Sequence, residues 1–104
     1  MTEHDQTNLD LMKRRVELVG EVSALTARAL KLTQALSGIE MDILRLELEI
    51  GRSGDSQELA RELQDTEDRA ETQRKAHADC MEEIAAVEAD VAALDRMIAA
   101  SQGG

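Results

Sequence analysis

The chain reads Ile50-Gly51-Arg52-Ser53-Gly54-Asp55-Ser56-Gln57-Glu58-Leu59 near its midpoint, and this stretch decides the fold. Two glycines with serine and aspartate residues beside them are typical of a loop between two regular segments. Gly51 suits the end of one helix, and Asp55 can cap the next, with Glu58 three residues later as the capping-box acid. The stretch therefore predicts a turn over residues 51–56.

The segments on both sides of this turn have the composition of long helices. The 104 residues include no proline and no Phe, Tyr or Trp, while 42% are hydrophobic and 33% are charged. Helix interiors exclude proline, whereas a compact sandwich or α/β domain would normally use aromatic side chains to fill its core. We therefore expect an all-α protein with helices over residues 9–50 and 57–100, and Thr7 or Asn8 can cap the first of them.

Each predicted helix carries a seam of mostly apolar residues that recur at alternating steps of four and three, the heptad pattern of coiled coils. The seam of the first helix consists of Leu11, Arg15, Leu18, Val22, Leu25, Ala29, Leu32, Leu36, Ile39, Ile43, Leu46 and Ile50. The seam of the second consists of Leu59, Leu63, Thr66, Ala70, Gln73, His77, Cys80, Ile84, Val87, Val91, Leu94 and Ile98.

The two seams are out of phase across the turn, and this decides how the helices pair. Ile50 and Leu59 are nine residues apart, which is not a whole number of seam steps along one straight helix. If the chain folds back so that these two residues face each other, one register matches all twelve positions of both seams. We predict an antiparallel coiled-coil hairpin, a single domain over residues 9–100, with flexible ends at 1–8 and 101–104.

A second apolar stripe lies beside the seam at the end far from the turn. A two-helix hairpin buries only its seam, so this stripe needs another cover. A second copy would supply it and form a homodimeric four-helix bundle with two-fold symmetry, and a different protein is the alternative cover. The predicted protein interface consists of Leu9, Met12, Val16, Val19, Leu30, Met81, Ala85 and Ala92.

The other surfaces are expected to be polar. The flank opposite the apolar stripe carries Arg14 and Glu21 and should be solvated. Residues 40–72, around the turn, include eleven acidic residues and four arginines, which indicates either a solvated tip or an acidic surface that docks a basic partner. Asp42 would meet Arg69 across the hairpin there.

Arg15 is the one charged residue in either seam, and two interpretations apply to it. A buried polar seam residue can specify register or oligomeric state. Alternatively, the long side chain can extend its charged head to solvent, toward Asp95 or Asp10, which is the interpretation we favour.

No arrangement of residues predicts catalysis. His77 and Cys80 are one helical turn apart, and two copies could offer a zinc ion two of each. The preferred interpretation is that both are ordinary seam residues, since cysteine is commonly buried as a small hydrophobic residue. A thin hairpin has no cleft to perturb an acid or base, and the sequence has no nucleophile set or phosphate-binding loop. We expect no catalytic residues, no metal and no cofactor.

The charge and the cysteine count limit the partners and the compartment. The net charge of −10 argues against nucleic acid and anionic membranes as direct partners. A single cysteine cannot form an intramolecular disulfide, so a reducing cytoplasm is expected. The first residues do not have the basic and apolar regions of a signal peptide, and no apolar run is long enough for a membrane span.

The outline of about one hundred residues, a hairpin, acidity and a capacity to dimerise resembles that of the small WXG-type secreted helical proteins. Those proteins carry a Trp-x-Gly motif in the turn, where this chain has Ile50-Gly51-Arg52. Coiled-coil export chaperones and stalk proteins of flagellar and type III secretion systems share the outline. The first functional hypothesis is a bacterial cytoplasmic adaptor or regulator that acts by binding protein. The resemblance of shape implies the alternative, a secretion-system component.

Overall fold

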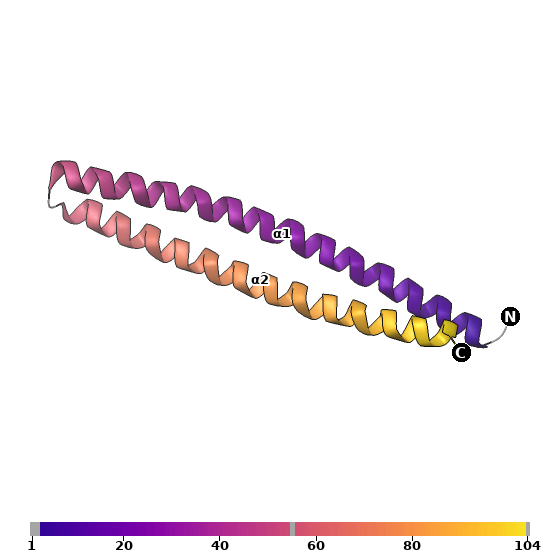
Figure 1. The fold of residues 1–104 in the computed structure, drawn as a ribbon. Helices are drawn as coiled ribbons and strands as arrows, with labels where there is room; N and C mark the ends of the chain where they lie inside the picture. Colours follow the sequence, from indigo (N-terminus) through magenta and orange to yellow (C-terminus); the bar gives the residue numbers. More distant parts are fainter. Residues whose placement is uncertain (1–2, 55, 104) are drawn as a thin grey trace. The chain divides into compact units, whose positions relative to one another are not determined.

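Two long helices joined by a short turn make up the computed structural model of the chain (Figure 1). The structure describes residues 3–54 and 56–103. Helix α1 spans Glu3–Ser53 and helix α2 spans Gln57–Gly103. The predicted all-α helical hairpin is therefore confirmed. Over the described residues, neither helix has a stretch that is both long and apolar enough to cross a membrane.

Gly54 ends α1. Its φ of +75° is in the left-handed region, and its N–H donates to the carbonyl of Ile50 at 3.1 Å. This is the αL form of helix C-cap, which favours glycine because a Cβ would be strained there. The helix therefore runs three residues beyond the predicted end at residue 50. Gly51 lies inside it, because one glycine in a helix costs only about 1 kcal/mol relative to alanine.

Ser56 caps the start of α2. Its hydroxyl oxygen accepts a hydrogen bond from the N–H of Leu59 at 3.3 Å, and its carbonyl accepts one from the N–H of Ala60 at 3.0 Å. The first bond satisfies a donor that the first turn of a helix otherwise leaves free, and the second is the first regular bond of the helix. The predicted cap, Asp55, lies outside the described residues. With Ser56 as the cap, the third helical residue is Leu59, so Glu58 does not occupy the capping-box position.

Replacing Ser56 with alanine is expected to lower the free energy of unfolding by about 1 kcal/mol, because the N–H of Leu59 loses its acceptor. Urea denaturation followed by circular dichroism measures the change. Ser53→Ala is the matched control, since the Ser53 hydroxyl only donates to the carbonyl of Glu49 within α1. Equal losses for the two variants would contradict the assignment of Ser56 as the cap.

Both helices are longer than predicted. Residues 3–8 belong to α1 and residues 101–103 belong to α2, beyond the predicted bounds of 9–50 and 57–100, and the flexibility expected of the ends stays a prediction. Thr7 and Asn8, proposed as caps, lie within α1 instead of at its start. No proline or glycine interrupts residues 3–8, and so the helix continues past the last seam position.

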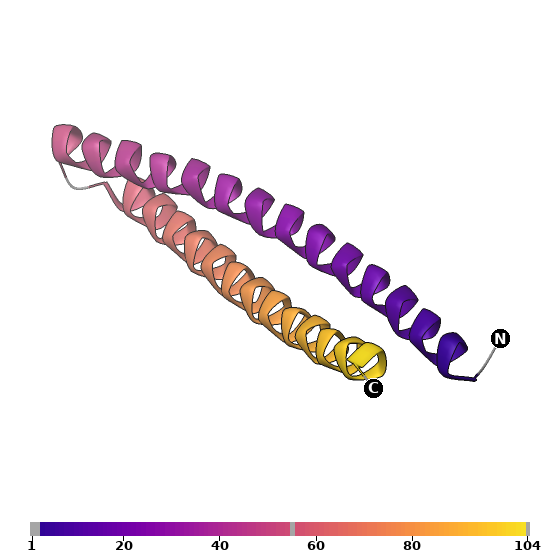
Figure 2. The same ribbon diagram turned by 45° about the vertical axis from the view of Figure 1, so that its right-hand side comes forward.

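The chain divides into two compact units. Unit 1 contains Met1–Ala27 and Cys80–Gly104, and unit 2 contains Arg28–Asp79 with the turn. Within each unit, a segment of α1 runs antiparallel to a segment of α2, as both views show (Figures 1 and 2).

The core of each unit is the predicted seam. Every position of both seams is buried or half-buried. All of the most buried side chains are seam residues: Leu18, Cys80 and Ile84 in unit 1, and Ala29, Ile39, Leu46, Thr66 and Ala70 in unit 2. The heptad repeat therefore correctly identified the face of each helix that is turned to its neighbour.

Polar side chains weaken the α2 seam of unit 2. The buried hydroxyl of Thr66 donates to the carbonyl of Glu62 at 2.7 Å and is thereby satisfied within its own helix. The side-chain carbonyl oxygen of Gln73 is buried without a hydrogen-bond partner among the described residues. An unpaired buried oxygen is costly, so Gln73 is a weak point in this seam.

The ion pairs of unit 2 differ from those predicted. Asp42 lies 3.5 Å from Arg45 on its own helix and does not pair with Arg69. Across the hairpin, Arg74 lies 3.7 Å from Glu40. Long exposed side chains can form ion pairs of similar free energy with several partners. The apolar seam therefore sets the register of the two helices without these pairs.

Candidate protein-interaction surface

Large apolar side chains are exposed along one side of the helix pair of unit 1, and one more, Met97, is exposed beside Arg14 on the opposite flank. Seven of the eight predicted interface residues lie in this unit, and all seven are exposed. The exposed fractions of the five large ones range from 40% for Val19 to 71% for Val16. We call these seven residues the apolar face of unit 1: Leu9, Met12, Val16, Val19, Met81, Ala85 and Ala92.

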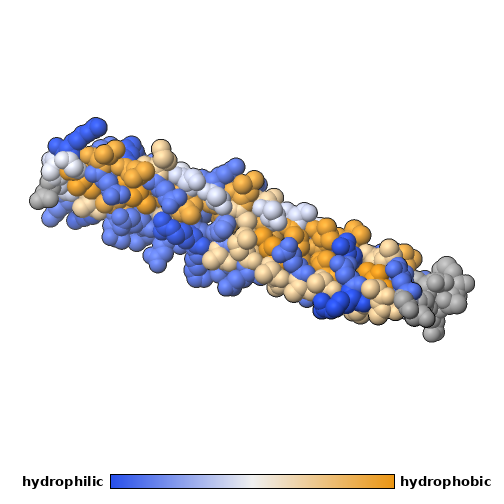
Figure 3. All heavy atoms as spheres, in the orientation of Figure 1, coloured by the Kyte–Doolittle hydropathy of each residue, from blue (hydrophilic) through white to orange (hydrophobic). Residues whose placement is uncertain are grey.

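The helical repeat explains why these side chains gather. On α1 they occupy positions next to the seam and one step further out, at alternating spacings of three and four. The residues of α2 occupy the corresponding positions. Because the two segments are antiparallel, these flanks lie on the same side of the unit. Figure 3 shows apolar surface over this part of the molecule.

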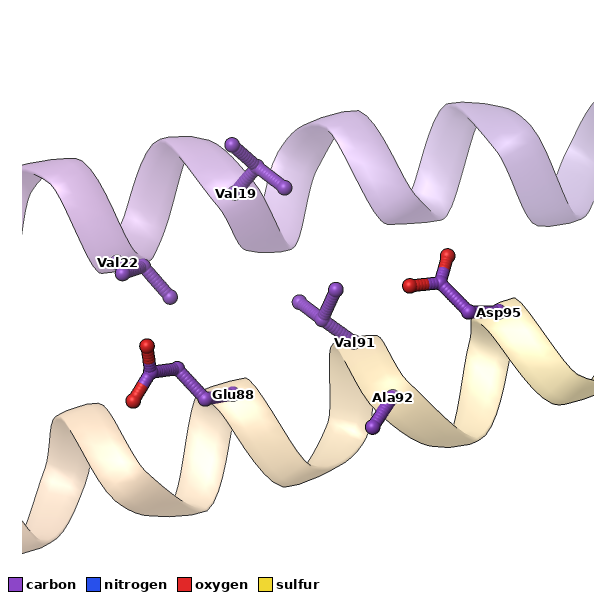
Figure 4. Close-up of a pocket in the computed structure, with 6 residues that line it drawn as sticks. All are labelled: Val19, Val22, Glu88, Val91, Ala92 and Asp95. Atoms are coloured by element: carbon purple, nitrogen blue, oxygen red, sulfur yellow. The ribbon is translucent and has the colours of Figure 1, made fainter.

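A groove lies within this face. It has a volume of about 290 Å³, and Val19, Val22, Val91 and Ala92 supply its apolar lining. Figure 4 shows Val22 and Val91 between the two helices, with the carboxylates of Glu88 and Asp95 reaching from α2 toward α1. An apolar floor with acidic groups at its edge suits an apolar side chain that has a basic neighbour.

Arg15 and Asp95 form an ion pair at the edge of the groove. The Arg15 Nε donates to Asp95 Oδ1 at 2.5 Å, and Nη2 lies 3.5 Å from Oδ2. The hydrogen bond and the charge of Asp95 raise the pKa of Arg15. The predicted extension of Arg15 toward Asp95 is confirmed. Glu88, by contrast, has no ion pair among the described residues.

The flank predicted to be solvated is also hollowed. In unit 1, Ala24, Leu25, Ala86 and Val87 line a groove of about 460 Å³ with Glu21 and Glu83. The sequence pattern did not predict this groove, because its alanines lie between charged residues.

Unit 2 holds the eighth predicted residue and three that sequence reasoning missed. Leu30 is exposed in this unit, and so are Met41, Leu44 and Leu48, in the region predicted to be polar. The prediction of a polar surface rested on the large number of acidic residues around the turn and did not consider these apolar residues among them. Its spacing of three and four was a readable signal in the sequence.

Cys80 is a buried, hydrogen-bonded residue of the seam. Its thiol donates to the carbonyl of Leu25 at 3.3 Å within unit 1. His77 is half-buried at its seam position in unit 2. Among the described residues, no group of three or more His, Cys, Asp or Glu side chains is arranged to hold a metal ion.

Comparison with known proteins identifies no relative. No protein-family model matches the sequence, and neither a curated protein nor a solved structure matches the chain.

Proposed function

We propose that this chain is a non-enzymatic protein-interaction module, a small cytoplasmic adaptor or regulator, and that the apolar face of unit 1 is its docking surface. The exposure of all seven face residues on one side of the unit supports this proposal. Contiguous exposed apolar surface is costly in water, and in natural proteins it generally marks a site that another surface covers.

A second copy is the cover we propose. Two hairpins that pack through such faces make a four-helix bundle, in which each pair of helices buries what the other leaves exposed. Ala85 and Ala92 on α2 leave room for the backbones to approach closely. A helix of a protein partner would bind the same face in place of the second copy, in the manner of an amphipathic helix in an apolar groove.

The charges at this face are compatible with a second copy. Glu88 at the groove has no ion pair among the described residues of unit 1, and neither has Lys13. Lys13 lies one helical turn from Val16 and Leu9 on α1, beside the face. A homodimer therefore offers a basic group from one copy to the acidic groove of the other.

The double substitution Val16→Asp and Val19→Asp tests the proposal. Both side chains are exposed in the single chain, so the variant should remain helical. A carboxylate buried without a partner costs well over the 1.4 kcal/mol that corresponds to a factor of ten in Kd, and we expect self-association to weaken at least about tenfold. Light scattering at matched concentrations, with circular dichroism for helicity, measures both properties.

Ala24→Asp with Ala89→Asp is the matched control. It adds the same two charges to exposed positions of unit 1 outside the apolar face. We expect the control to keep the mean mass of the unmodified chain. An unchanged mass for the Val16 and Val19 variant, or a monomeric unmodified chain, would overturn the proposal.

A further inference from the structure

The outer side of α1 in unit 2 carries an apolar stripe that nothing in this unit covers. The exposed fractions of Leu30, Met41, Leu44 and Leu48 are 59%, 67%, 58% and 62%. All the large exposed apolar side chains described in unit 2 belong to α1. We infer that α1 of a second copy packs on this stripe in parallel orientation, as a two-stranded coiled coil. Its residues belong to unit 2, whereas the apolar face belongs to unit 1.

The spacing of the stripe is that of a second coiled-coil seam. Leu30, Gln34, Ser37, Met41, Leu44 and Leu48 follow one another at steps of four, three, four, three and four. These positions lie roughly opposite the first seam on α1, since they are two residues before or five residues after its members. The helix is already formed by packing against α2, so the coiled coil does not have to nucleate it.

Charged residues border the stripe in an order that specifies a parallel partner. Glu40 and Glu47 follow one edge, and Arg45 and Arg52 follow the other. In a parallel coiled coil, a residue on the first edge meets the residue five positions later on the other chain. That rule pairs Glu40 with Arg45 and Glu47 with Arg52 of the second copy. An antiparallel pair would instead place the acidic edges together and the basic edges together.

This pattern is self-complementary, which is why the occupant we propose is a second copy. Each chain supplies both the acidic and the basic edge, in the spacing that its own duplicate requires. Gln34 adds a second constraint, because a polar residue in a coiled-coil seam favours the register in which it meets its counterpart. A partner with uniform basic charge would pair with the glutamates and be repelled by Arg45 and Arg52.

The pair from residues 47 and 52 is available in the single chain. Neither Glu47 nor Arg52 has an ion pair among the described residues. Glu40 lies 3.7 Å from Arg74, and Arg45 lies 3.5 Å from Asp42, in exposed pairs that can exchange at little cost. Glu47 and Arg52 are therefore the best residues for a test.

Charge reversal separates this pairing from an effect of net charge. Glu47→Arg lowers the negative charge of the chain and Arg52→Glu raises it, so a general repulsion between copies would change their association in opposite directions. Ion pairing predicts that both single substitutions weaken association, about tenfold each, because two symmetry-related pairs become repulsive. The double variant restores both pairs and should return to within about twofold of the unmodified chain. Sedimentation equilibrium measures the three constants.

Disulfide trapping tests the orientation in full-length chains that carry Cys80→Ala. In a parallel dimer, the cysteines of two Leu30→Cys chains should form a disulfide with each other, and so should those of two Leu48→Cys chains. Each disulfide should form at least about tenfold faster than the one between two Gln64→Cys chains. Gln64 is an exposed residue of α2 in unit 2 and serves as the control. Cross-links that form only when the Leu30→Cys and Leu48→Cys chains are mixed would show an antiparallel pair and overturn the inference, and so would equal rates for all three.

The same measurements in the Val16→Asp and Val19→Asp background distinguish the two contacts. If the unit 2 contact is correct, self-cross-linking at residues 30 and 48 persists there, whatever becomes of the apolar face of unit 1. Failure of charge reversal to weaken association overturns only the unit 2 inference and leaves the proposed docking surface of unit 1 standing.

Discussion

Leu46→Ala is expected to lower the free energy of unfolding by about 2–5 kcal/mol, the range for a leucine removed from a packed core. Leu46 is only 2% exposed, and it is the largest of the fully buried side chains described. Its removal costs both the transfer of its methyl groups from water and the cavity that remains, because two rigid helices cannot close on the space. Urea denaturation at low protein concentration measures the loss.

Leu44→Ala is the matched control for this substitution. Leu44 is the same residue type in the same unit, two positions away on α1, but it is 58% exposed. We expect its replacement to change the free energy of unfolding by less than about 0.5 kcal/mol under the same conditions. Equal losses at the two positions would contradict the seam as the core of unit 2.

Gln73→Leu is expected to raise the free energy of unfolding by about 1–3 kcal/mol. The Gln73 side-chain oxygen is buried without a hydrogen-bond partner among the described residues, and the folded state carries the cost of its lost hydration. Leucine has a similar reach and returns the seam to the apolar pattern of its neighbours. Amide hydrogen exchange along α2 in unit 2 should slow together with the rise in stability.

Gln64→Leu provides the comparison for Gln73→Leu. Gln64 is exposed on α2, and its amide group donates to Asp68 at 3.0 Å. Substitution there adds apolar surface without relieving a buried group, so we expect a change of less than about 0.5 kcal/mol. A destabilised Gln73→Leu variant would mean that the buried amide oxygen is satisfied in solution, for example by a bound water molecule.

These polar seam positions bear on the proposed self-association of unit 2. Thr66, Gln73 and His77 keep the α2 side of its seam less apolar than the α1 side, which includes Ile39 and Leu46. Stability that one helix pair does not supply by itself can come from a second copy, since any partner that binds only the folded state stabilises it. Self-association through α1 would therefore raise the stability of unit 2 as the protein concentration rises.

The local sequence was sufficient to predict the helices, their pairing and the buried face. A heptad repeat is a property of successive residues, and only one antiparallel register aligns the seam that ends at Ile50 with the one that begins at Leu59. Burial of every seam position follows from that register. The exposure of Val16 and Val19 beside the seam follows equally, because two helices cannot cover more than the faces they turn to each other.

Details that depend on one residue or one rotamer were not predictable in this way. Gly54 and not Gly51 ends α1, because Gly54 is the glycine that adopts the left-handed backbone. Both glycines stand in the predicted turn, and either could have ended the helix. Asp42 pairs with Arg45 and not with Arg69. This choice could not be predicted, because exposed ion pairs of this kind differ in free energy by less than about 1 kcal/mol.

The all-α hairpin, its register and the residues of the apolar face of unit 1 could therefore be predicted, since these follow from periodicity and from the position of one turn. The backbone conformation that ends α1 and the choice of ion pairs came from the tertiary structure, because each depends on one glycine or one rotamer. Met41, Leu44 and Leu48 lie among acidic residues, so the charge of this region does not reveal that it also carries apolar side chains. Their exposure follows from their spacing, because each lies two residues before a seam position and so leaves α1 on the side away from α2.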